Sequence, residues 1–276
     1  EMSNMFEVFE LEFMRLAFLG GTLVGVLAPT IGIFLVLRRY GLIGDGLGHI
    51  AFGGVAFGQL VRADPILMAL GYSALAAVGI ERLRARGRLG GDVAIAIFLS
   101  SGLALGLVLA RLARRSTDQL WSYLFGSVIA LQTSDVIKLA VMAALVLGVI
   151  FLVRRELFFI TFDEETARAS GIRVGFYNLL LVLLAALTIV SAIQIVGLLL
   201  ISALLVLPVA AAFQLARSFR QALFAAIVCS LLSVYGGLVG SYYLDTQPGP
   251  TIVLAALGLF GLASLWRALS ARFYSA

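Results

Sequence analysis

The stretch Val174–Ala216, VGFYNLLLVLLAALTIVSAIQIVGLLLISALLVLPVAAAFQLA, contains no charged residue. Gly197 separates two apolar runs within it, and each run approaches the roughly 20 residues that an α-helix needs to cross a bilayer. Helices that are apolar on every face are stable in lipid or in a protein core, but not in water. The stretch therefore predicts two successive membrane-spanning helices, Val174–Ser191 and Gly197–Ala216.

The rest of the chain has a similar composition. Hydrophobic residues make up 62% of its 276 residues and charged residues 13%, whereas a soluble domain carries about 25% charged residues. The mean hydropathy is +1.07, and no long polar stretch remains for a separate soluble domain. We therefore expect an all-α integral membrane protein, a polytopic bundle of about eight to nine transmembrane helices forming one domain over residues 1–276.

Short polar breaks separate the other apolar runs, and their boundaries are good to about four residues. The further predicted spans are Phe13–Leu37, Leu47–Val61, Pro65–Ile80, Val93–Ala110, Val136–Val153, Ala222–Tyr242 and Thr251–Ala268. The segment Leu120–Leu131 is too short to cross a membrane, and we expect it to be re-entrant or interfacial.

The distribution of Lys and Arg predicts the orientation, because these residues accumulate in cytoplasmic loops. With the N-terminus outside, 14 of the 20 basic residues fall on the cytoplasmic side and 6 outside. The outer cluster Arg111–Arg115 is the main exception. The acidic start, Glu1–Glu12, has no basic segment, so we expect no cleavable signal peptide. The sequence predicts an external N-terminus and a cytoplasmic C-terminus, and it explains the net charge of +5 without nucleic acid.

The single histidine, His49, follows Asp45 by four residues. On a helix, this spacing places both side chains on one face. An ionisable residue within a membrane span is costly and marks a functional site by default, and a carboxylate with an imidazole suits a first-row divalent metal. The alternative is structural, with Asp45 capping the helix and His49 bonding to a neighbouring carbonyl.

Two ligands do not complete a metal site. A two-fold symmetric dimer would bring two copies of Asp45 and two of His49 together around its axis. Four nitrogen and oxygen ligands suit tetrahedral zinc, whereas manganese would need further oxygen ligands. This reasoning favours zinc slightly over manganese, and iron remains possible. We expect no permanently bound cofactor.

The segment Asp163–Gly171 is polar and lies on the predicted cytoplasmic side. Asp163 has the character of an N-cap, Glu164 and Glu165 suit a first helical turn, and Gly171 suits the position just after the helix. The segment therefore predicts a short helix outside the bilayer. It is either a solvated loop helix or a docking element for a cytoplasmic partner.

Other residues carry weaker signals. We expect Asp92 to cap the span that follows it, Gln194 to bond between helices, Pro208 to kink its helix and Asp245 to form a turn. The lone cysteine, Cys229, indicates a small buried hydrophobe. The sequence has no nucleotide-binding Walker pattern, so any ATP must be used by another chain.

These motifs together resemble the membrane permease of bacterial ABC importers for zinc, manganese or iron. The resemblance covers nearly the whole chain in order. Three motifs carry it. The first is Leu37–Arg39 followed by Gly44–His49, and the second is Trp121–Ser127 followed by the Asp163–Gly171 segment. The third runs from Val196–Gly197 through Leu205–Ala212, with Asp245 and Gly249–Pro250 near the end.

The resemblance implies a homodimeric permease of the cobalamin and siderophore importer type in a bacterial plasma membrane. Cytoplasmic ABC ATPase subunits and an extracytoplasmic metal-binding protein would complete the importer, and the permease itself would be no enzyme. Asp45 and His49 would belong to the metal pathway. The segment 163–171 would be the coupling helix that docks on the ATPase, through Asp163, Glu164, Glu165, Ala167, Arg168 and Gly171. A secondary transporter or channel that works without an ATPase is the alternative.

Overall fold

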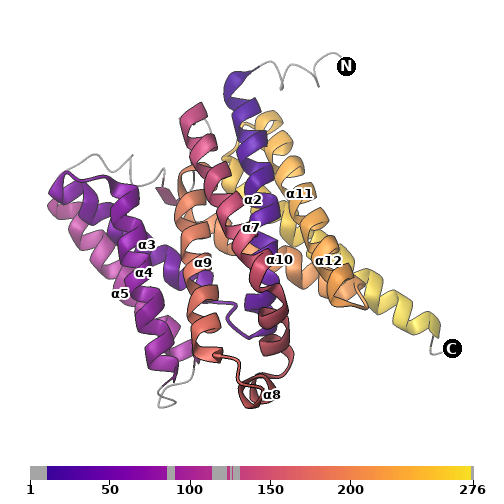
Figure 1. Cartoon of the computed structure of the whole chain (residues 1–276). Coiled ribbons are helices and arrows are strands. Elements are labelled where there is room, and N and C mark those ends of the chain that lie inside the picture. Colours follow the sequence, from indigo (N-terminus) through magenta and orange to yellow (C-terminus); the bar gives the residue numbers. More distant parts are fainter. Residues whose placement is uncertain (1–10, 86–90, 114–122, 125, 127–130, 275–276) are drawn as a thin grey trace.

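The computed structural model describes the chain except for residues 1–10, 86–90, 114–122, 125, 127–130 and 275–276. The described residues form nine long helices and one short helix (Figure 1). They are α2 (Glu12–Leu37), α3 (Ile43–Val61), α4 (Pro65–Ala85), α5 (Gly91–Leu112), α7 (Thr133–Phe162), α8 (Glu164–Ala169), α9 (Val174–Val196), α10 (Leu198–Leu215), α11 (Phe219–Tyr243) and α12 (Pro248–Tyr274).

Each of the nine predicted spans corresponds to one long helix, and the differences lie at the ends. Seven described helices are long and apolar enough to cross a membrane, namely α2, α4, α5, α7, α9, α11 and α12. The apolar part of α10 is shorter, and α3 is not among the seven. The polar residues Asp45, His49 and Gln59, together with many glycines, lower the hydropathy of α3.

Two boundary predictions need correction. We expected a span beginning at Leu47, but α3 begins at Ile43, so Asp45 lies in its first turn and not ahead of it. We expected Asp92 to cap its helix, but α5 already includes Gly91, so Asp92 lies inside the first turn. An acidic side chain is favourable there too, because it interacts with the positive end of the helix dipole.

The helices form two groups with α9 between them, and α7 packs against α2 and α9 (Figure 1). Helices α3, α4 and α5 pack together, whereas α2, α10, α11 and α12 form the other group. The short helix α8 lies at the end of the bundle opposite the N-terminal end of α2, and α12 ends toward the same side as α8 (Figure 1). The chain therefore enters at one end of the bundle and leaves toward the other.

Helix α3 is packed tightly on three sides through its glycines. A Cβ added at Gly48 would lie 3.0 Å from Leu198 of α10, and one added at Gly46 would lie 2.9 Å from Ile95 of α5. A Cβ at Gly54 would lie 2.6 Å from the Cα of Ala69 in α4. Small residues allow membrane helices this close approach. They fix α3, and the polar residues that it carries, among three neighbouring helices.

Candidate functional site

Asp45 and His49 lie one turn apart on α3, and both side chains are half-buried. The Asp45 carboxylate is close enough to His49 to act on it electrostatically. His49 Nδ1 is buried and has no hydrogen-bond partner among the described residues. A buried polar atom without a partner is rare and costly. The structure therefore places the predicted pair on one face and leaves a histidine nitrogen unsatisfied within the chain.

The backbone beside His49 is irregular. Leu198, which contacts the neighbouring Gly48, is the first residue of α10, and Gly197 separates α9 from α10 with φ of 78°. Gly126 also has φ of 78°, and a Cβ there would lie 2.9 Å from the nitrogen of Gly197. Non-helical backbone at membrane depth is tolerated only where it is buried in protein or lines a cavity. The polar pair thus lies next to a helix break that a further segment covers.

The described residues of one chain contain no group of three or more His, Cys, Asp or Glu side chains that could hold a metal ion. Asp45 and His49 supply two donors, whereas a closed zinc site usually needs four. A divalent ion bound here would need further ligands, such as backbone carbonyls, water or the side chains of a second copy.

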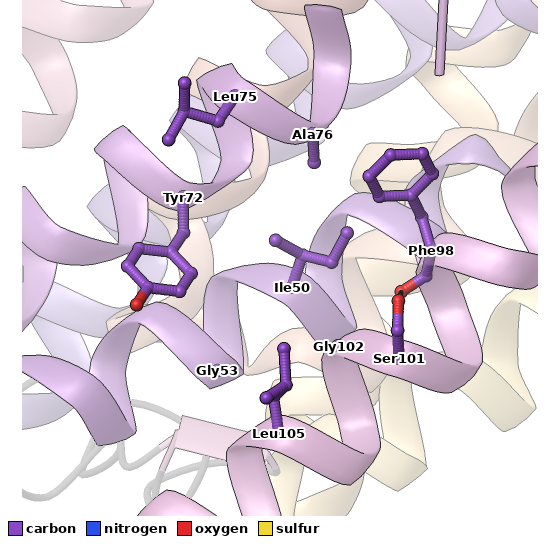
Figure 2. A pocket seen from close by; sticks show the side chains of 9 residues that line it. All are labelled: Ile50, Gly53, Tyr72, Leu75, Ala76, Phe98, Ser101, Gly102 and Leu105. Carbon is purple, nitrogen blue, oxygen red and sulfur yellow. Dashed lines mark hydrogen bonds between the residues drawn. The ribbon is translucent and has the colours of Figure 1, made fainter. Parts of the chain in front are cut away.

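An apolar pocket of about 210 Å³ lies between α3, α4 and α5 (Figure 2). It is lined by Ile50, Gly53, Tyr72, Leu75, Ala76, Phe98, Ser101, Gly102 and Leu105. Leu75 and Leu105 are largely exposed, and the Ser101 hydroxyl already donates to the carbonyl of Ile97. A cation would find no charged ligand there, so this pocket is not part of the polar site.

Helix α8 has the boundaries that its sequence predicts. The Asp163 side chain accepts a hydrogen bond of 2.9 Å from the Thr166 amide, and bonds to Thr166 hold the pKa of Asp163 below its usual value. At the other end, Gly171 has φ of 84°, its amide donates to Arg168, and the Ile172 amide donates to Ala167. These two bonds form a Schellman motif, which ends a helix sharply.

The two faces of α8 differ. Ala167 is fully buried and packs against Ile160 and Val174, so it anchors the helix to the ends of α7 and α9. Glu165 and Arg168 are exposed. Together with Glu164 and Ala169 they line a hollow on the surface. A partner that meets α8 from outside would therefore contact the charged face, and Ala167 would contribute only by holding that face in place.

The structure also joins α8 to the bundle through charges that the sequence did not reveal. Arg38, whose side chain is 4% exposed, pairs with Glu164 at 2.9 Å. Burial lowers the pKa of the Arg38 guanidinium and Glu164 opposes that shift, but an arginine keeps its charge in proteins. Asn178 and Glu81 are buried nearby. The sequence shows that Asn178 and Glu81 are polar residues in or beside apolar spans. It does not show that Arg38 pairs with Glu164.

Other predicted residues have mixed outcomes. Asp245 lies in the turn between α11 and α12 with φ of 49°, as a turn residue would. Gln194 belongs to the last turn of α9, but its side chain lies outside the described part of the structure, so the expected bond between helices stays a prediction. Most of the segment Leu120–Leu131 lies outside the described residues, so its predicted re-entrant character stays a prediction. Tyr123 and Leu124 pack against the apolar cluster that contains Phe52 and Leu198.

The long apolar helices, the polar face of α3 and the charged helix α8 define a multi-pass helical membrane protein of the transporter permease class. The chain belongs to the ABC 3 transport family, because the model of that family matches residues 10–267.

Relatives agree over nearly the full length. The manganese transport system membrane protein MntC of Listeria innocua is 32% identical over 254 residues, covering 92% of this chain and 90% of the relative. The high-affinity zinc uptake system membrane protein ZnuB of Haemophilus influenzae is 32% identical over 252 residues, covering 91% of this chain and 97% of the relative. The structure of PsaBC from Streptococcus pneumoniae in complex with a Fab matches with a TM-score of 0.86 and 31% identity, over 95% of both chains. The expected fold and family resemblance are confirmed.

Proposed function

We propose that this chain is the transmembrane permease of an ATP-driven importer that moves a divalent transition metal into the bacterial cytoplasm. The observation that carries the proposal is the pair Asp45 and His49, with its unpartnered nitrogen, on the glycine-packed helix of an ABC 3 family member. The single transmembrane domain would cover residues 1–276. The chain would work as a transport subunit and leave ATP hydrolysis to another protein.

The donor set supports a first-row metal and leaves the choice between metals to experiment. Carboxylate and imidazole ligands serve zinc, manganese and ferrous iron. Two copies of Asp45 and His49 around a two-fold axis would supply four ligands, which suits zinc best and manganese next. Relatives named for manganese and for zinc are each 32% identical to this chain, so identity does not separate the two metals.

The outer face of α8 supports docking on a cytoplasmic ATPase. Glu165 and Arg168 are exposed beside a hollow, and the buried Ala167 fixes the helix that carries them. Arg38 and Arg84 lie at the same end of the bundle as α8. Basic residues are enriched on the cytoplasmic side of membrane proteins. We therefore infer that α8 and the C-terminus face the cytoplasm and that the N-terminus lies outside.

The proposed mechanism is alternating access in a homodimer. An extracytoplasmic binding protein delivers the ion to the outer end, and closure of the ATPase dimer moves the two α8 helices. The permease halves then rock about the site formed by Asp45 and His49. The ion is held there only briefly, because a transporter must release what it binds.

The test uses the permease with its cognate ATPase and binding protein reconstituted in liposomes. Tagged permease should co-purify the ATPase, and ATP hydrolysis should rise with zinc or manganese delivered by the binding protein. The metal that gives the largest stimulation identifies the cargo. Permease that binds no ATPase and carries metal without ATP would instead be a secondary transporter or channel, and the proposal would be wrong.

A further inference from the structure

A continuous set of polar contacts runs from α8 into the membrane bundle through Arg38. Its Nη2 donates to Glu164 Oε2 of α8 at 2.9 Å, and its Nη1 donates to Asn178 Oδ1 of α9. Glu164 uses its other oxygen, Oε1, to accept a bond of 3.1 Å from Arg168. Arg168 is 71% exposed whereas Arg38 is 4% exposed. Glu164 therefore connects the outer face of α8 to a buried guanidinium.

The contacts continue from Asn178 to α4. The Glu81 carboxylate of α4 lies close to Asn178, and the Tyr40 hydroxyl donates to Glu81 Oε2 at 3.2 Å. The Arg84 guanidinium lies 4.1 Å from the centre of the Tyr40 ring. Asn178, Glu81 and Tyr40 are all at most 9% exposed. The set thus joins α8, α9 and α4 to the turn between α2 and α3.

This turn has little freedom. The Arg39 and Tyr40 amides donate to the carbonyls of Val36 and Leu35 at 3.1 and 2.8 Å, which makes a Schellman motif with Arg39 at φ of 60°. The Ile43 amide then donates to the carbonyl of Tyr40 at 3.0 Å, at the start of α3. A displacement of Arg38 or Tyr40 must therefore move the first turn of α3.

That first turn carries Asp45, five residues after Tyr40. We propose that Arg38 is a positioning residue that transmits the movement of α8 to the Asp45 and His49 pair on α3. The inference rests on the proposed function, since it needs an ATPase that moves α8 and a metal that passes α3.

Simple attachment of α8 does not require these charges. Ala167 already holds α8 through apolar contacts with Ile160 and Val174. A buried ion pair is often no more stabilising than well-packed apolar side chains of similar size. The geometry of Arg38, which bonds two helices at once, adds a directional connection that the apolar anchor does not provide.

The experiment measures metal transported per ATP hydrolysed by the reconstituted importer. In Arg38→Gln, we expect the ATPase still to co-purify and to hydrolyse ATP, while transport per ATP falls about tenfold, within the 5–150-fold range typical of coupling between sites. The matched control is Arg39→Gln, because the neighbouring Arg39 is exposed and its side chain forms no hydrogen bond or ion pair with the described residues. Its transport per ATP should stay within about twofold of the parent, as usual for surface substitutions.

The second variant is Glu164→Gln, which tests the contact between Arg38 and Glu164 if Arg38→Gln fails to fold. Glutamine keeps an oxygen acceptor, and Glu164 is half-exposed, so the substitution should be tolerated. Glu164→Gln should lower the ratio in the same direction, and the double variant should be no worse than the more severe single variant. An unchanged ratio in Glu164→Gln, or additive losses in the double variant, would overturn the inference. If the parent itself shows no metal-stimulated ATP hydrolysis, the proposed function fails and not this connection alone.

Discussion

Two polar regions of the molecule share the same bundle but differ in how their side chains are satisfied. Around Arg38, the buried polar side chains are bonded to one another: Arg38 to Glu164 and Asn178, and Glu81 to Tyr40. On α3, His49 Nδ1 is buried, and neither this nitrogen nor the Asp45 carboxylate forms a hydrogen bond with the described residues.

The difference separates polar groups that are satisfied within the chain from the Asp45 and His49 pair, which we propose binds the transported ion. Because unpaired buried polar atoms cost free energy, the unsatisfied nitrogen of His49 gives the fold no benefit. The bonded cluster, in contrast, would lose contacts on several helices if one member were removed. The two regions should therefore respond differently to substitution.

The largest effect is expected for His49→Ala and Asp45→Ala. Metal transport should fall by about 100-fold or more, because loss of a second-shell partner alone costs about 10–100-fold in a metal site. Thermal stability in lipid nanodiscs should change little. Transport is measured as uptake of radioactive zinc and manganese by liposomes that contain the complete importer.

The controls for this prediction are Ser73→Ala and Ser230→Ala, since both hydroxyls are also buried with no hydrogen-bond partner in the described part of the chain, but lie on α4 and α11. They should leave uptake unchanged. Equal losses of uptake in the serine and the His49 variants would show that an unpartnered atom does not by itself mark the metal pathway. The comparison between the two regions would then fail.

An intermediate effect is expected for Gly54→Ala, which tests how α3 is held. Its Cβ would lie 2.6 Å from the Cα of Ala69, and such overpacking typically costs about 1–3 kcal/mol. Gly71→Ala is the matched control, because a Cβ there would meet nothing within 4 Å, and it should be neutral or stabilising by up to about 1 kcal/mol. Unfolding of both variants in mixed micelles gives the two values, and a smaller loss at Gly54 than at Gly71 would contradict the packing.

The smallest effect concerns Asp163 and the pH. Bonds to Thr166 lower the pKa of Asp163 in the folded chain. The stabilisation of α8 by this side chain is therefore fully present above the ordinary Asp pKa of about 3.9. It is lost as the pH falls through the lower folded value. Asn also caps helices, so Asp163→Asn should remove this dependence. Pepsin cleavage of α8, compared between parent and variant as the pH is lowered, should differ a few-fold only at the acid end.

Much of the fold follows from local sequence. Apolar runs of the right length predict the spans, and Asp163 and Gly171 predict both ends of α8, because caps act within a few residues. The beginning of α3 was predicted late, since the glycines and Asp45 ahead of Leu47 look like a loop when their packing against other helices is unknown.

The candidate site was predictable only in part. The spacing of Asp45 and His49 indicates a shared helix face, which the structure has. The pairing of Arg38 with Glu164 joins residues 126 positions apart. No periodicity or capping rule reaches over that distance, and only the packing of α2, α8 and α9 brings the two side chains together.

The composition of α3 also bears on how the protein enters the membrane. Helix α3 falls outside the seven helices that are apolar and long enough to span by themselves, because its glycines and polar side chains reduce the gain from transfer into lipid. Only Arg62–Asp64 separates α3 from α4, and the two helices pack closely through Gly54 and Gly58. Insertion of α3 during synthesis should therefore depend on α4 leaving the translocon with it as a hairpin. The polar side chains that we propose serve the ion should thus also make the insertion of α3 depend on a second helix.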